Sequence, residues 1–412
     1  MAEPKVRFKR DDGSSYPPWA SGKLGDITEK VDRKAPKQST APVMMVSQGK
    51  GFIFQSDKYS RENAGQSLKN YTLLKQGEFA YNHGASKAKP YGVAYCLTEE
   101  PEARVPFVYH TFRIAEGVNP YWHEALNTSK MDRQLKRMVS SGARMDGLLN
   151  INYDTYMDAD VNIPCVEEQQ KIADFLSSVD DVISTSEQEV ANLETQKKAV
   201  MKKVFSQEVR FKRADGTDFP DWEEKTLGSF AKRVTRKNKD NACKLPLTIS
   251  AEYGLIDQSE FFNKTVASKD MSTYYLLQNG EFAFNKSTSK DYPVGAIKRL
   301  DRYDVGAVSP LYICFELYGH DVLSDFVVQY FETDCWHQGV LDIAQEGART
   351  HGLLNISVPG FFETVHELPS DLEEQRLIAD FLSDFDEAIA AAKKELELWK
   401  ELKKGLLQQM FV

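Results

Sequence analysis

The chain contains nearly the same pattern twice, and this duplication limits the folds open to it. Val6-Arg7-Phe8-Lys9-Arg10 returns as Val209-Arg210-Phe211-Lys212-Arg213, at an offset of 203 residues. Further along, Gly-Leu-Leu-Asn-Ile occurs at 147–151 and 352–356, and Ile-Ala-Asp-Phe-Leu occurs at 172–176 and 378–382. A period this long corresponds to a whole domain rather than to a solenoid unit. The sequence therefore predicts a tandem duplication of a globular domain followed by a helix.

Each copy ends in a segment with the spacing of a long, paired helix. The stretch from Glu167 to Phe205 contains neither Gly nor Pro, and its apolar positions alternate in steps of four and three. Such an a/d heptad pattern is typical of a coiled-coil seam, and a lone helix cannot bury it. We expect the two helices to pair with each other through Ile172, Leu176, Val179, Ile183, Val190, Leu193, Ile378, Leu382, Phe385, Ile389, Leu396 and Trp399.

The expected pairing is antiparallel, because the connection after Phe205 is short and a whole domain precedes the second helix. This arrangement gives the chain an internal pseudo-two-fold axis. Lys197 and Lys403 occupy equivalent seam positions. A polar seam residue either fixes the register of a coiled coil or marks a point where the seam frays, and the sequence leaves both open. The fold class is α/β, with two mixed α/β domains separated by the helix pair.

Composition restricts the classes of function. The 412 residues carry a formal charge of −9, which is unusual for a non-specific nucleic-acid binder. Charge is uneven, with 23 basic and 19 acidic side chains in residues 1–165 against 18 and 24 in residues 207–370. A sequence-specific binder tolerates an acidic total if its basic residues are clustered.

Several motifs of catalysis and targeting are missing. The sequence has no P-loop, no Gly-x-Gly-x-x-Gly, and no His or Cys pair with metal-ligand spacing. We therefore expect neither a catalytic centre nor a metal site. The five cysteines form no Cys-x-x-Cys pair, and no apolar run approaches the ~20 residues that span a bilayer. These features, with no apolar signal-peptide core, predict a cytoplasmic protein.

Matched polar loops are the best candidates for a binding surface. One pair of loops follows the Gly-Glu-Phe-Ala strands, a second ends in a matched Arg, and a third is a short turn. Lys, Asn and Ser on Gly-flanked loops suit contacts with phosphates and base edges, although a solvated loop has the same composition. The matched Arg residues equally suit a salt bridge within the domain. The candidates are Ser47, Lys50, Asn82, His83, Ser86, Lys87, Lys89, Arg144, Ser250, Tyr253, Asn285, Lys286, Ser287, Thr288, Ser289, Lys290 and Arg349.

The order of these motifs resembles the specificity (S) subunit of Type I restriction–modification systems. The resemblance covers essentially the whole chain. It rests on the two helix entries, Pro164-Cys-Val-Glu-Glu-Gln-Gln and Pro369-Ser-Asp-Leu-Glu-Glu-Gln, on Gly-Leu-Leu-Asn-Ile twice, and on Asn285-Lys286-Ser287 followed by Tyr292-Pro293-Val294-Gly295. The first copy departs from this pattern at His83-Gly84-Ala85. This departure is consistent with two domains that recognise different halves of one target site.

The resemblance implies a sequence-specific DNA-binding subunit without catalytic activity. It implies target-recognition domains at 1–163 and 207–368 and conserved helical regions at 164–206 and 369–412. Each domain would read half of a split, asymmetric double-stranded DNA site, while the helices set the spacer and dock two modification (methyltransferase) subunits. Restriction subunits join the full complex, and S-adenosylmethionine, ATP and magnesium belong to the partner subunits. A non-catalytic coiled-coil adaptor with duplicated protein-binding domains is the alternative.

Overall fold

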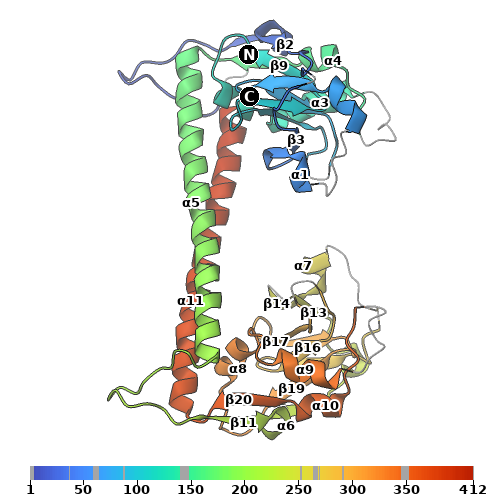
Figure 1. Cartoon of the computed structure of the whole chain (residues 1–412), viewed down its shortest axis with the longest axis vertical. Coiled ribbons are helices and arrows are strands. Elements are labelled where there is room, and N and C mark those ends of the chain that lie inside the picture. The colour runs from blue at the N-terminus through green and yellow to red at the C-terminus, as the bar shows by residue number, and fades with distance from the viewer. Residues whose placement is uncertain are drawn as a thin grey trace. The chain divides into compact units, whose positions relative to one another are not determined.

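The computed structural model contains two compact units, and each unit combines one globular domain with half of each long helix (Figure 1). Unit 1 comprises residues 1–187 and 393–412, and unit 2 comprises residues 188–392. The structure describes residues 4–36, 38–58, 65–86, 89–139, 148–250, 253–262, 268, 270–289, 292–344 and 352–411.

Short strands and helices make up the domain of unit 1, and a long helix follows them. In chain order the elements are β1 (Ala20–Lys23), η1 (Leu24–Ile27), β2 (Thr28–Lys30), β3 (Met44–Ser47), β4 (Gly51–Phe54), α1 (Gln55–Lys58), η2 (Gly65–Asn70), β5 (Thr72–Lys75), β6 (Phe79–Asn82), β7 (Val93–Cys96), β8 (Glu102–Val105), β9 (His110–Ile114), α2 (Asn119–Ala125), α3 (Ser129–Met138), α4 (Tyr153–Met157), β10 (Asp160–Ile163) and α5 (Val166–Phe205).

Unit 2 repeats this order. Its elements are β11 (Trp222–Thr226), α6 (Leu227–Phe230), β12 (Ala231–Arg233), η3 (Lys239–Asn241), β13 (Leu247–Ser250), β14 (Gly254–Asp257), α7 (Gln258–Phe262), β15 (Tyr275–Gln278), β16 (Phe282–Asn285), β17 (Ala296–Arg299), β18 (Val305–Val308), β19 (Ile313–Leu317), α8 (Ser324–Tyr330), α9 (His337–Ile343), α10 (Val358–Glu363), β20 (Val365–Pro369) and α11 (Leu372–Met410).

The duplication seen in the sequence extends to strand topology. A four-stranded sheet has the order β2-β9-β6-β7 in unit 1 and β12-β19-β16-β17 in unit 2. Three two-stranded pairs accompany it, β1-β10, β3-β4 and β5-β8 in unit 1 and their counterparts β11-β20, β13-β14 and β15-β18 in unit 2. All pairings are antiparallel, and Phe79 lies opposite Phe112 as Phe282 lies opposite Phe315. The predicted mixed α/β domains and long helices are confirmed.

The long helices belong to the domain cores as well as to each other. In unit 1, Ile172 and Leu176 of α5 are buried with Trp122, Tyr156 and Phe411. In unit 2, the equivalent Ile378 and Leu382 of α11 are buried in one cluster with residues from the last turns of α5. The first seam positions of each helix therefore pack into a globular core. Of the twelve predicted pairing residues, Ile172, Leu176, Val179, Val190, Ile378, Leu382 and Leu396 are buried, and the other five are half-buried.

A buried carboxylate fastens each domain to its helix. The Glu168 side chain, in the first turn of α5, accepts hydrogen bonds from Arg7 Nε at 3.0 Å, Arg7 Nη2 at 2.8 Å and Trp19 Nε1 at 2.9 Å. In unit 2, Glu374 accepts the same three bonds from Arg210 and Trp222, at 3.1, 2.9 and 3.2 Å. These contacts explain why the Val-Arg-Phe-Lys-Arg string, the Trp and the Glu-Glu helix entry are all duplicated.

A buried glutamine beside each carboxylate extends this joint. Gln169 Nε2 donates to the Pro164 carbonyl, and Gln169 Oε1 accepts from the Val118 amide. Gln375 makes the equivalent bonds to the Pro369 carbonyl and the Leu323 amide. Free backbone groups next to each helix start are thereby satisfied inside the protein, where an unpaired polar group is costly.

Removing the arginine of this clamp should destabilise the domain. The Arg7→Met variant leaves the fully buried Glu168 carboxylate without its cation, which costs roughly 3–5 kcal/mol of unfolding free energy. Arg210→Met should have an effect of similar size on unit 2. Urea unfolding followed by tryptophan fluorescence measures both. Arg113→Met is the control, since its partner Glu29 is exposed and such pairs contribute under about 1 kcal/mol; an equal effect of Arg7→Met and Arg113→Met would refute the clamp.

The two helices run antiparallel within unit 1. Asp180 of α5 pairs with Lys403 of α11 at 2.8 Å, and Glu187, two turns later, pairs with Lys400 at 3.0 Å. In unit 2 the other seam lysine, Lys197, pairs with Asp386 at 2.6 Å. Asp180 and Asp386 occupy equivalent positions in the duplicated sequence. Both seam lysines are therefore bound to a carboxylate on the opposite helix, which favours the register-fixing role over fraying.

The ion pairs of both seam lysines also reach a helix of the globular domain in the same unit. Lys403 Nζ donates to Glu124 of α2 at 2.9 Å, and Asp386 accepts from Gln329 of α8 at 2.9 Å. Burial alone would lower the pKa of the Lys403 ammonium, but Glu124 and Asp180 together raise that pKa. In each unit one polar cluster, which we call the joint, therefore connects the helix pair with the globular domain. It consists of Lys403, Asp180 and Glu124 in unit 1 and of Lys197, Asp386 and Gln329 in unit 2.

Exchanging the charges of one joint tests whether it sets the register. Lys197→Asp places two carboxylates in contact and should lower the unfolding free energy of unit 2 by at least about 1 kcal/mol. Adding Asp386→Lys should restore at least half of the loss, and the double-mutant cycle measures this coupling. A second substitution that rescues nothing would show that the pair is incidental.

Candidate nucleic-acid interface

The β6–β7 loop of unit 1 is held by two of its predicted DNA-contact residues. At the end of β6, Asn82 Nδ2 donates to the Val46 carbonyl at 3.0 Å, and Asn82 Oδ1 accepts from the Gly84 amide at 3.0 Å. His83 is buried, and its ring nitrogens lie 2.8 Å and 2.9 Å from the Leu149 and Val108 carbonyl oxygens. The ring of His83 is thus enclosed with both nitrogens against backbone oxygens, and its contact with DNA stays a prediction. Asn82 shapes the loop.

A second histidine lies beneath this loop. His110 of β9 stacks on His83 with ring centroids 4.9 Å apart, and its Nε2 lies 3.0 Å from the Ile151 carbonyl. Burial lowers the pKa of His110 to about 4, so the ring is neutral at physiological pH. The neutral ring of His110 therefore supports the loop from below by stacking on His83.

The outer part of the β6–β7 loop presents Ser86 and Lys89. Ser86 is exposed and its hydroxyl bonds Gln48, and Lys89 Nζ donates to the Asn127 carbonyl at 3.2 Å. Gln48 Nε2 also donates to the Gly84 carbonyl at 3.0 Å. Gln48 lies in the β3–β4 turn, so the turn with Ser47 and the exposed Lys50 is tied to the loop. Two separately predicted segments thus form one surface.

The β16–β17 loop of unit 2 connects the equivalent pair of strands but carries different side chains. Asn285 Oδ1 accepts from the Ser287 amide at 3.1 Å, and the Thr288 amide and hydroxyl donate to the Gly352 carbonyl at 2.7 and 3.2 Å. Ser289 Oγ accepts from the Tyr292 amide at 3.2 Å. Asn285, Thr288 and Ser289 therefore stabilise the loop, while Ser287 is exposed and Lys286 is half-buried.

Lys286 is the clearest difference between the two loops. It occupies the position of His83 in the duplicated sequence, and burial lowers the pKa of its ammonium. A half-buried cation whose charge is penalised by its surroundings is well suited to an incoming phosphate or to the acceptor edge of guanine.

Both loops close through a glycine that no other residue can replace without strain. Gly92 and Gly295 have φ of +80° and +83°, and a Cβ atom would lie 2.5 Å and 2.1 Å from the carbonyl oxygens of Asn82 and Asn285. The matched glycines that follow the polar strings in the sequence are thus a requirement of the turn.

The β13–β14 turn of unit 2 separates one structural residue from one exposed residue. Ser250 is buried, and its hydroxyl accepts from the Tyr253 amide at 3.1 Å. Ser250 therefore holds the turn in this structure, and its contact with DNA stays a prediction. Tyr253, in contrast, is 62% exposed at the tip of the hairpin. The predicted residues Lys87, Arg144, Lys290 and Arg349 lie outside the described residues.

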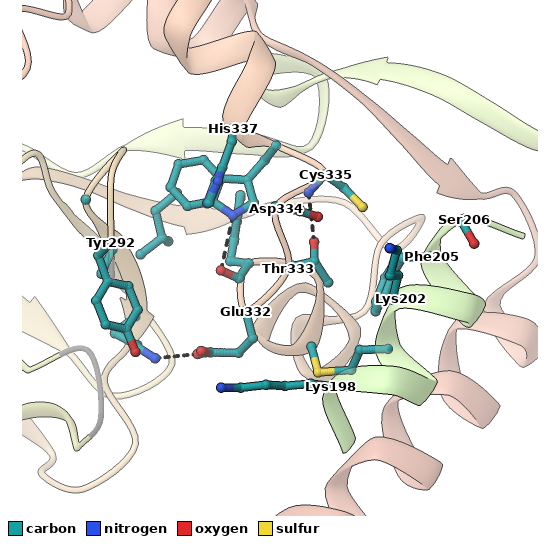
Figure 2. Close-up of a pocket in the computed structure, with 17 residues that line it drawn as sticks. Lys198, Lys202, Phe205, Ser206, Tyr292, Glu332, Thr333, Asp334, Cys335 and His337 are labelled. Atoms are coloured by element: carbon teal, nitrogen blue, oxygen red, sulfur yellow. Dashed lines mark hydrogen bonds and ion pairs between the residues drawn. The ribbon is translucent and has the colours of Figure 1, made fainter. Parts of the chain in front are cut away.

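A cavity of about 470 Å³ adjoins the β16–β17 loop (Figure 2). Tyr292 from the loop, Glu332 and Lys198 of α5 lie around it, and Lys298 pairs with Glu332 at 2.5 Å. No local sequence signal points to this cavity, because its walls come from α5, the loop and the segment between α8 and α9.

Two features are absent from the parts of the chain that the structure describes. No group of three His, Cys, Asp or Glu side chains is arranged to hold a metal ion. Within the same residues, no helix combines the length and apolar character needed to cross a membrane.

Comparison with known proteins agrees with the resemblance inferred from the duplicated motifs. No family model matches the chain. It is 25% identical over 291 residues to the Type I restriction enzyme MjaVIII specificity subunit of Methanocaldococcus jannaschii, and the match spans 65% of each protein. The chain therefore aligns with slightly less than two thirds of that relative's length.

Two solved structures have the same fold over nearly their whole length. The Type I restriction–modification S subunit of M. genitalium superposes with a TM-score of 0.54 at 12% identity, covering 100% of this chain and 99% of that chain. A chain from a structure describing assembly and conformational transition of the type I R-M system gives 0.53 at 13% identity, covering 96% and 98%. The arrangement of two mixed α/β domains and two long helices is thus the fold of these proteins.

Replacing Lys286 tests the role of the β16–β17 loop. We expect Lys286→Ala to weaken DNA binding and to reduce the slope of log K against log salt by about one, since one phosphate contact is lost. Binding is measured across a salt series, with Lys232→Ala as control, an exposed lysine of the same unit that pairs with Glu316. An unchanged affinity and slope would remove Lys286 from the interface.

Proposed function

We propose that this protein is the sequence-specific DNA-recognition subunit of a Type I restriction–modification complex and has no catalytic activity of its own. Each globular domain reads one half of a bipartite, asymmetric site on double-stranded DNA. The observation that carries this proposal is the pair of matched loops on identical sheets, with an enclosed His83 in one and a half-buried Lys286 in the other. Two equivalent sheets whose loops carry different side chains suit the recognition of two different half-sites.

The fold and the curated relative support the same function. The structures that share this fold are described as belonging to Type I restriction–modification systems, and the relative is described as a specificity subunit. The coiled-coil adaptor alternative has no such support. It remains the outcome that a failed DNA-binding experiment would favour.

The long helices set the distance between the two half-sites and dock two modification subunits. Each helix is continuous, with 40 residues in α5 and 39 in α11, and each takes part in both units. Phe175 and Phe381 occupy equivalent positions on the two helices and are 36% and 37% exposed. Equivalent apolar positions suit two copies of one partner. S-adenosylmethionine, ATP and magnesium are bound by the modification and restriction subunits.

Selection from random DNA tests the function. The chain is purified with its modification subunits, bound duplexes are enriched and sequenced, and methylated positions are mapped. We expect a motif of two unlike parts with a fixed gap. Enrichment without a two-part motif would refute the proposal and favour the adaptor.

Lengthening the helix pair tests how the gap is set. One heptad is inserted between Glu187 and Gln188 of α5 and another between Ala392 and Lys393 of α11, where the two units meet along the chain. These positions leave the Lys403–Asp180 and Lys197–Asp386 pairs intact within their units. Seven residues add about 10 Å of helix, so we expect a gap longer by about three base pairs with unchanged half-sites.

The matched control inserts the heptad in α5 alone, which disrupts the pairing of the helices and should abolish binding. An unchanged gap in the double insertion would show that the helices do not set the spacing.

A further inference from the structure

A cavity of about 650 Å³ in unit 1 is lined by cationic side chains. It lies among Lys89 of the β6–β7 loop, the first turns of α3 and the last turns of α11. Its basic lining residues are Lys89, Lys130, Arg133, Lys400, Lys403 and Lys404. No acidic residue is among the described residues that line it. Such a lining selects for an anion.

The cations on α11 are already engaged with carboxylates. Lys403 binds Glu124 and Asp180, Lys400 pairs with Glu187 at 3.0 Å, and Lys404 pairs with Glu401 at 3.2 Å. The Lys403 pairs belong to the joint between helices and domain. The Lys400 and Lys404 pairs are partly exposed and therefore contribute little to stability, so these ammonium groups are free to turn toward a stronger anion.

Two cationic side chains of α3 lie next to each other, one turn apart. Lys130 and Arg133 lie three residues apart, which places them on the same side of the helix. Burial and the charge of Arg133 lower the pKa of the Lys130 ammonium, and Asp160 offsets part of this effect. No carboxylate lies within ion-pair distance of Arg133 in the described part of the chain. A bound anion would relieve the repulsion between these two cations.

The start of α3 adds to the attraction. Asn127, Thr128 and Ser129 line the same cavity, and Thr128 is the N-cap of this ten-residue helix. The first amides of a helix and its dipole favour an anion at this end. The cationic side chains and the first amides of α3 therefore favour an anion in the same cavity.

The cavity of unit 2 occupies the equivalent place but mixes both charges, since Lys198, Lys202 and Lys298 line it together with Glu332 and Asp334. At the offset of 205 residues, Cys335 and Gln338 stand where unit 1 has Lys130 and Arg133, and Glu332 stands where it has Asn127. Tyr292 replaces Lys89 at the offset of 203. Glu332 lies in that cavity, as Figure 2 shows, and it neutralises Lys298. The anion site is thus specific to one copy of the duplication.

We infer that the unit 1 cavity binds a phosphate group, and that in the working complex this is a backbone phosphate of the DNA next to the first half-site. This inference rests on the proposed function. Lys89 links the cavity to the β6–β7 loop, so a phosphate held there would fix the register of the first domain on the duplex without reading a base. Among its described residues unit 2 has no equivalent phosphate site, so its contacts with DNA depend on the β16–β17 loop.

A charge-matched pair of double variants tests this inference in the complex with modification subunits. Lys130→Gln with Arg133→Gln removes the cavity cations. Lys136→Gln with Arg137→Gln removes two exposed cations from the same helix that do not line the cavity. We expect the cavity variant alone to reduce the salt slope of DNA binding by about one to two, with the enriched motif unchanged. Equal effects of the two double variants would overturn the site.

A second measurement without DNA separates this inference from the proposed function. Pyrophosphate should raise the melting temperature of the wild-type chain and of the Lys136→Gln/Arg137→Gln variant, but not of the cavity variant. If no form binds a two-part DNA motif and this protection persists, the proposed function fails while the site stands as one for free phosphates. If the motif is found but the cavity variant changes neither the slope nor the protection, the site fails while the function stands.

Discussion

The structure depends on one buried carboxylate at the start of each long helix. Glu168 and Glu374 are enclosed, and each accepts hydrogen bonds from an arginine and a tryptophan that arrive from the beginning of its own copy. An ionised carboxylate without partners inside a protein is very costly, so the segment that carries the arginine and the tryptophan must assemble together with the helix. The β6–β7 and β16–β17 loops are placed relative to the helix by this assembly, because the sheet that carries them packs on the same core.

The seam lysines also hold the structure through contacts with carboxylates, further along the helices. A purely apolar seam would allow the helices to slide by a heptad, whereas Lys403 and Lys197 each meet a single equivalent aspartate. Both joints also contact a helix of the globular domain in the same unit. Register between the helices and orientation of each domain on its helices are therefore specified by the same few polar contacts. The proposed function, which requires a set distance between two half-sites, depends on both.

Much of the fold could be predicted from the sequence, and less of the site. Duplication and heptad spacing are repeated local signals, and they predicted the two mixed α/β domains, the two long helices and the bounds of the first helix to within one residue. The partner of Glu168 lies 161 residues away, so no local pattern could reveal the clamp. At the site, duplication alone did not separate residues that hold a loop from residues that face outward. Asn82, His83 and Ser250 are engaged inside the protein, whereas Lys50 and Tyr253 are exposed.

This distinction gives the duplication its physical meaning. Residues identical in both copies, such as Arg7 and Arg210 or Gly92 and Gly295, satisfy demands of the fold that are the same twice. Positions that differ, such as His83 against Lys286 and Lys130 against Cys335, change the charge at equivalent places in the two units. In a chain with a net charge of −9, general attraction to DNA is weak. Under the proposed function, cations held at a few chosen points would supply the phosphate contacts, and their unequal placement in the two units would let one chain treat the two halves of a site differently.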